Sequence, residues 1–109
     1  MIDSQLYGAK CIFMHRNRRG IPGTSYEERI VIISAASLDN AIELGEAEAS
    51  QYAASVSDCT YIKFIDVYKL PVSELRPGME VYSIMRRSTL NPPEFLDHYY
   101  DDGTQCSQR

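Results

Sequence analysis

The fold is decided at a junction in the middle of the chain, which reads Ile30-Val31-Ile32-Ile33-Ser34-Ala35-Ala36-Ser37-Leu38-Asp39. Its first four residues are β-branched, and such side chains are stiff at χ1 and favour a strand over a helix. Ser37 then offers an N-cap hydroxyl, and Asp39 adds an acid to the turn that follows. A strand over residues 26–35 is therefore predicted to pass directly into a helix.

That helix is predicted over residues 38–54, where there is no proline and the hydrophobic period becomes helical. Small residues recur every four positions on its apolar face, at Ala41, Gly45, Ala49 and Ala53. The opposite face is polar. A stripe of small side chains allows a helix to lie close against a sheet.

Three more segments have the pattern of strands. Residues 7–15 and 61–70 alternate with period two, and residues 79–86 do so after a predicted type II turn with Pro77 and Gly78 at its centre. Both faces of residues 7–15 are largely apolar, which indicates an inner strand. The element order is then β-β-α-β-β.

This order predicts an α+β fold of two layers, in which one helix packs on a mainly antiparallel sheet of four strands. Residues 1–87 form the single domain, and residues 88–109 are a C-terminal extension. In that extension Pro93 suits the first turn of a short helix.

Length and composition limit the class of protein. The chain has 109 residues, of which 44% are hydrophobic and 24% charged, so we expect a soluble globular domain. Neither a membrane span nor a signal peptide is apparent. The formal net charge of −4 argues against a general nucleic-acid binder. Three scattered cysteines without a CxxC pair fit the reducing cytoplasm, without a disulfide framework or a zinc site.

No pattern in the chain predicts a reaction. His15 and His98 are expected at surface positions, with neither arranged beside a Ser, Cys or Asp. The acids lie on the polar helix face or in the tail, and no phosphate-binding glycine motif is present. The sequence therefore predicts no catalytic residue, no cofactor and no metal site.

Two segments remain as candidate binding surfaces. Residues 15–25 form a long basic loop in which Arg16, Arg18 and Arg19 either contact phosphate, nucleic acid or an acidic protein, or are simply solvated.

In the tail, aromatic residues and acids alternate. Phe95, Leu96, Tyr99 and Tyr100 share a helical face. One interpretation is a short helix that caps the open face or the edge of the sheet, with Phe95 and Leu96 in the core. The other is a partner-binding surface, and its candidate residues are Tyr99, Tyr100, Asp101 and Asp102.

Several segments resemble one small bacterial family, known as domain of unknown function 4288. The segments are Tyr7-Gly8-Ala9-Lys10, Tyr26-Glu27-Glu28-Arg29-Ile30-Val31-Ile32-Ile33, Phe64-Ile65-Asp66-Val67-Tyr68-Lys69-Leu70 and Gly78-Met79-Glu80-Val81-Tyr82-Ser83. The basic loop and the tail after Arg87 are additions to the family pattern. The resemblance implies a fold and a bacterial origin, and it implies no catalytic residue.

We therefore expect a non-catalytic protein-binding module of the bacterial cytoplasm. Its specific form would be a toxin-neutralising immunity protein, because an acidic partner is steered toward a basic nuclease toxin. Two alternatives remain open: nucleic-acid or phosphate binding through residues 15–25, and a structural or regulatory adaptor that forms a homodimer.

Overall fold

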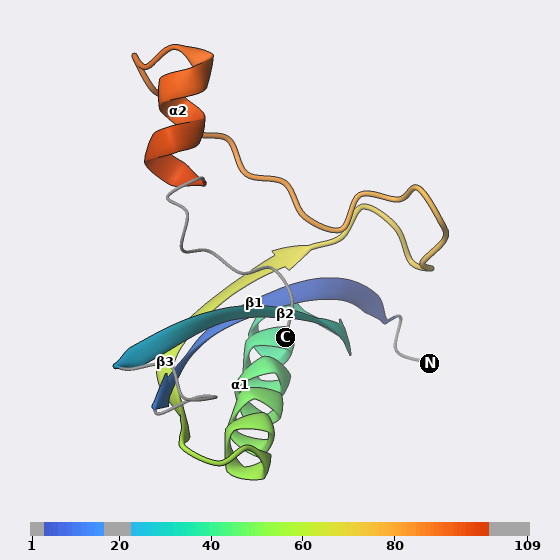
Figure 1. The fold of residues 1–109 in the computed structure, drawn as a ribbon. Coiled ribbons are helices and arrows are strands. Elements are labelled where there is room, and N and C mark those ends of the chain that lie inside the picture. The colour runs from blue at the N-terminus through green and yellow to red at the C-terminus, as the bar shows by residue number, and fades with distance from the viewer. Residues whose placement is uncertain (1–3, 17–22, 101–109) are drawn as a thin grey trace.

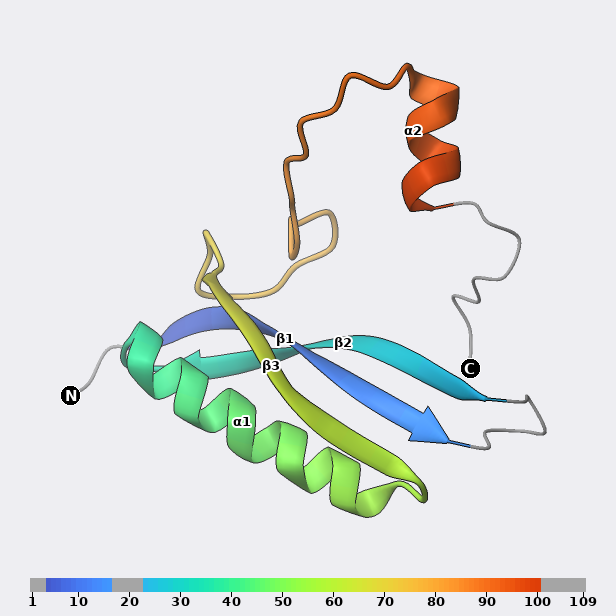
Figure 2. The same ribbon diagram turned by 90° about the vertical axis from the view of Figure 1, so that its left-hand side faces the viewer.

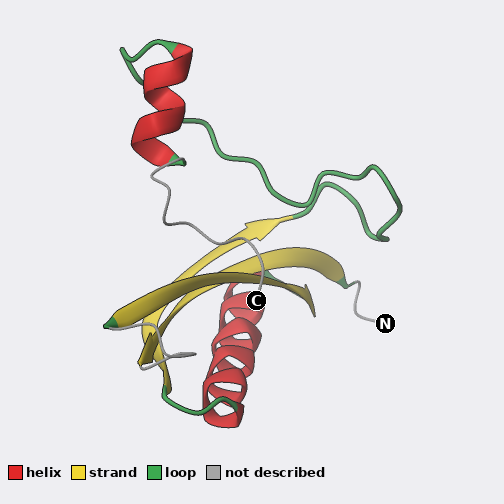
Figure 3. Ribbon diagram, in the orientation of Figure 1, coloured by secondary structure: helices red, strands yellow, loops and turns green. Residues whose placement is uncertain are grey.

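The computed structural model describes residues 4–16 and 23–100, which form an antiparallel sheet and two helices (Figures 1 and 3). In chain order the elements are β1 (Gln5–Arg16), β2 (Thr24–Ala35), α1 (Leu38–Ser55), β3 (Cys59–Lys69) and α2 (Pro92–Tyr99). The predicted α+β class is confirmed. In the described residues, neither helix is long and apolar enough to cross a membrane.

The sheet has three strands in the order β2-β1-β3, with both neighbours antiparallel to β1. Tyr7 lies opposite Ile33 on one side and Lys69 on the other. β1 is therefore the central strand, as predicted, although α1 packs on only one of its two apolar faces. β2 and β3 are the two edge strands of this sheet.

Small side chains bring α1 against one face of the sheet. Ala41, Gly45 and Ala49 are its buried residues. A Cβ atom on Gly45 would lie 2.8 Å from Ile65 Cδ1 and 3.2 Å from Ala9 Cβ, so the helix approaches more closely than a larger residue would permit. The predicted N-cap is also present, since the Ser37 hydroxyl accepts the N–H of Asn40 at 3.1 Å.

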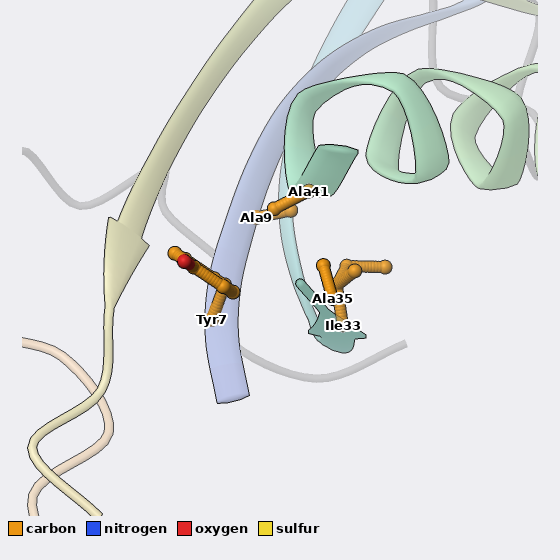
Figure 4. Close-up of a cluster of buried hydrophobic side chains, with 5 residues drawn as sticks. All are labelled: Tyr7, Ala9, Ile33, Ala35 and Ala41. Carbon is orange, nitrogen blue, oxygen red and sulfur yellow. The ribbon is translucent and has the colours of Figure 1, made fainter. Parts of the chain in front are cut away.

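The hydrophobic core lies between α1 and this face of the sheet. One cluster joins the first turn of α1 to the start of β1 and the end of β2 (Figure 4); it consists of Tyr7, Ala9, Ile33, Ala35 and Ala41. A second cluster follows toward the other end of the sheet and is built from Cys11, Phe13, Ala49 and Tyr61. Alternate residues of β1 thus supply the core.

A bulge in β3 alters its pairing with β1. Cys11 lies opposite Ile65, and Phe13 lies opposite Tyr61. Between these two pairs, β3 contains two more residues than β1. Lys63 takes up the excess with a φ of +66°. Its neighbours Ile62 and Phe64 are exposed, whereas Ile65 packs on the core.

The predicted fourth strand is wrong for the described residues. The turn that precedes it is present, because Gly78 has a φ of +86° and the Met79 N–H donates to the Arg76 carbonyl at 3.2 Å. Residues 79–86, however, pair with neither edge strand. Instead the Tyr68 hydroxyl donates to the Val81 carbonyl at 2.8 Å, which fixes the segment by a side chain rather than by a backbone ladder. Alternation alone could not reveal whether an edge would be within reach.

The tight contact between α1 and the sheet yields a prediction. Ala49→Leu should lower the free energy of unfolding by about 1–3 kcal/mol, because Ala49 is fully buried and the added atoms have no space. The matched control is Ala47→Leu on the exposed side of the same helix, which should change it by less than about 0.5 kcal/mol. Urea denaturation measures both, and equal effects would contradict the close packing of this face.

Candidate functional site

The helix α2 is stabilised by its own first turn. The Asn91 side chain accepts the N–H of Glu94 at 3.0 Å, and the Glu94 carboxylate accepts the N–H of Asn91 at 3.3 Å. This reciprocal pair is a capping box, and Pro92 and Pro93 occupy the first helical positions. The predicted helix, with Pro93 in its first turn, is confirmed. It needs no contact with the sheet to satisfy its N-terminal amides.

One face of α2 carries a partly exposed aromatic cluster. The Phe95 ring lies 4.7 Å from that of Tyr99 and 6.0 Å from that of Tyr100, measured between centroids. No residue of α2 is buried, and Leu96 and Tyr100 are 53% and 48% exposed. The expectation that Phe95 and Leu96 lie in the domain core is therefore wrong.

The reason is the course of residues 71–100, which we call the C-terminal arm. It leaves the end of β3, passes over the side of the sheet opposite α1 and carries α2 away from the domain (Figures 1 and 2). The radius of gyration is 16.5 Å, against about 13 Å for a compact chain of this length. The arm thus holds its helix away from the core.

One of the predicted tail residues, Tyr99, contacts a cation of the arm. The Arg86 guanidinium lies 4.9 Å from the centre of the Tyr99 ring, a cation–π contact. Beside it, Arg86, Ser88, Leu90, Pro92, Phe95 and Leu96 line an open groove of about 430 Å³. Asp101 and Asp102 lie outside the described residues, so an acidic rim around the tyrosines stays a prediction.

The basic loop is described only in part. Arg16 ends β1 as an exposed residue whose N–H donates to the Asp58 carbonyl at 3.1 Å. Arg18 and Arg19 lie outside the described residues. Arg86, an arginine of the arm, lies against Tyr99. Phosphate or nucleic-acid binding through residues 15–25 therefore stays a prediction.

The surface position predicted for His15 is wrong, as is the absence of a reactive side chain beside it. Its Nε2 atom lies 2.7 Å from Glu27 Oε1 and 3.9 Å from Cys59 Sγ. The side chains of His15 and Glu27 are only 4% and 7% exposed. The period-two pattern of residues 7–15 could have predicted the burial of His15, because His15 continues the strand face that carries Cys11 and Phe13.

Tyr52 of α1 completes this polar cluster. Its hydroxyl donates to the Glu27 carboxylate at 2.8 and 3.0 Å. Burial, and after it the bond to Glu27, raise the pKa of Tyr52, so the hydroxyl stays a donor at neutral pH. The Arg29 guanidinium stacks 3.8 Å from the Tyr52 ring centre and forms two hydrogen bonds with Glu48, at 2.7 and 2.8 Å. These contacts join α1 to β2 through polar groups.

The geometry of this cluster differs from that of a nucleophilic triad. A triad histidine faces its nucleophile with one ring nitrogen and its orienting acid with the other. Here the same nitrogen of His15 faces both Cys59 and Glu27. Cys11 lies in the neighbouring core cluster, where burial raises its thiol pKa and keeps it protonated. Within the described residues, no group of three His, Cys, Asp or Glu side chains is arranged to hold a metal ion.

The buried carboxylate leads to a prediction. Glu27→Ala should lower the free energy of unfolding by about 1–3 kcal/mol, because the Tyr52 hydroxyl and the His15 ring lose an acceptor in a buried position. Glu28→Ala on the same strand is the control. Glu28 is 68% exposed, so its loss should cost less than about 1 kcal/mol. Thermal and urea unfolding of the two variants test this, and similar losses would contradict a structural role for Glu27.

Comparison with known proteins supports the resemblance found in the sequence. The model of a family described as domain of unknown function (DUF4288) matches residues 6–83, from β1 to the first part of the arm. No curated protein and no solved structure matches. The helix α2 lies beyond the matched residues. Because the match covers more than half of the sequence, the chain belongs to the DUF4288 family.

Proposed function

We propose that this chain is a non-catalytic protein-binding module that presents α2 to a partner. The observation that carries this proposal is the helix itself: its own residues cap it, Leu96 and Tyr100 on its aromatic face are about half exposed, and the arm holds it away from the core (Figure 1). A helix of this kind costs little ordering entropy when it binds, because it is already formed.

The chemistry of the exposed face suits a protein partner. Phe95, Leu96, Tyr99 and Tyr100 lie at positions i, i+1, i+4 and i+5, which form one stripe along a helix. An apolar stripe of this form inserts into a groove of a partner protein. Tyrosine supplies a large rigid surface with a polar tip and is frequent at the energetic centres of interfaces.

The net charge supports one specific form of the proposal. At −4, the chain is attracted over long range to a basic partner in the bacterial cytoplasm, and this attraction raises the association rate. A basic nuclease toxin is such a partner, and the module would then act as its immunity protein. The test of this form is co-expression with the product of the neighbouring gene. A complex and protection of the cell are expected; the absence of both would count against the immunity role.

The general proposal is tested by capture with matched variants. Full-length protein, Leu96→Ala, Tyr100→Ala and Leu44→Ala are used as baits in lysate of the native cell, followed by quantitative mass spectrometry. Leu44 is an exposed leucine of α1 and serves as the control for Leu96. A hot-spot residue contributes roughly 2 kcal/mol or more, so we expect a partner to be depleted roughly thirtyfold with the two α2 variants.

The Leu44→Ala bait should retain that partner at the level of the unmodified protein. If all four baits retain the same proteins in equal amounts, α2 is not the binding element.

A further inference from the structure

Within the described residues, no helix or strand packs on the second face of the sheet, and the arm crosses part of it at Tyr82 (Figure 1). α1 packs on one side only, and the side chains of the opposite side alternate with those of the core. We call this the open face. Its apolar residues are Ile12 and Met14 of β1, Tyr26, Ile30 and Ile32 of β2, and Ile62 and Phe64 of β3.

These apolar side chains are exposed to solvent, although a packed sheet face would bury them. Those of the two edge strands are between 39% and 65% exposed. The β3 bulge contributes to this, because Ile62 and Phe64 flank it and both project from the sheet. A sheet normally buries one face and solvates a polar one, so an apolar face of this extent requires a partner surface.

The start of the arm extends the same surface. Lys10 Nζ on the open face donates to the Tyr82 hydroxyl at 3.2 Å, and the rings of Tyr68 and Tyr82 lie 5.7 Å apart. Tyr82 is therefore held against the sheet. Its neighbours remain uncovered: Val81, Ile84 and Met85 are exposed, with Met85 at 93%.

The area of this surface is that of a dimer interface. With roughly 200 Å² for a fully exposed side chain of this size, the edge-strand residues offer roughly 450 Å², and residues 81–85 offer about as much again. A stable interface buries roughly 800 Å² per partner, whereas the largest apolar patch of a typical monomer covers roughly 300–600 Å².

The charge of Lys10 on the open face is already paired within its own chain. Lys10 lies near the middle of the face, 3.5 Å from the Glu28 carboxylate and in register with Asp66. Its side chain is 14% exposed and already bonded within its own chain, so covering it leaves no unpaired cation.

We propose that the open face, together with residues 81–85 of the arm, is the interface of a homodimer, with Ile30, Ile32, Phe64 and Met85 in the contact. This inference goes beyond the proposed function, since it assigns the interface to the sheet and residues 81–85 rather than to α2. The dimer presents two copies of α2, which strengthens binding to a partner with two sites.

The test is the mass of the full-length protein in solution, measured by light scattering and sedimentation from low to high micromolar concentration. The unmodified chain should have twice its 12.4 kDa mass. Phe64→Glu and Met85→Glu should each halve that value, because each places a charge in the interface. Met85 is nearly fully exposed in the single chain, so its replacement does not threaten folding, and circular dichroism verifies this for both.

Two control variants distinguish the dimer from other occupants of the open face. Leu44→Glu on the outer side of α1 and Leu96→Glu on α2 should both remain dimeric. An unmodified chain that stays at 12.4 kDa, or dimers that survive both Phe64→Glu and Met85→Glu, would overturn the proposal. Loss of the dimer in Leu96→Glu would also overturn it, by assigning the open face to α2. A dimer with no α2-dependent partner would leave this inference standing and refute only the proposed function.

Discussion

The close approach of α1 to the sheet is the constraint on which the rest of the structure depends. Ala41, Gly45 and Ala49 allow the helix to lie directly over β1, and Ile65 and Ala9 then meet the backbone of Gly45 without room for a side chain. A helix packed this closely needs little further apolar surface. One helix of 18 residues therefore covers one face of a sheet of three strands, and nothing in the described chain does the same for the other face.

The two sides of the sheet consequently have different chemistry. The covered side contains the apolar clusters and, at the end near Phe13, a polar cluster in which Glu27 accepts hydrogen bonds from Tyr52 and lies beside His15. In this cluster the buried polar groups of β1, β2 and α1 satisfy one another's hydrogen bonds. The open side has exposed isoleucine and aromatic residues, and above it the arm carries α2. The open face and α2 are thus the two surfaces on which large apolar side chains remain exposed to solvent.

Sequence patterns were informative where the physical cause is local. Four β-branched residues, an N-cap serine and a stripe of small residues are local causes, and the elements that they predict are present within two residues at each end. The capping box of α2 is local too. Alternation also contained the burial of His15, which shares a face with Cys11 and Phe13, although its partners Glu27 and Cys59 come from two other strands.

By itself, the sequence determined the places of α1, α2 and the three strands β1, β2 and β3, the face of α1 that packs, and the family. Tertiary structure alone decided the partners of each segment. Residues 79–86 have a strand pattern, but a strand exists only where a second backbone offers its hydrogen bonds. Here the Tyr68 side chain, and not an edge strand, donates a hydrogen bond to the segment. Likewise, Phe95 and Leu96 are apolar enough for a core, but the arm places them on α2, away from the core. Periodicity specifies the side of an element that avoids water, and the path of the whole chain specifies what covers that side.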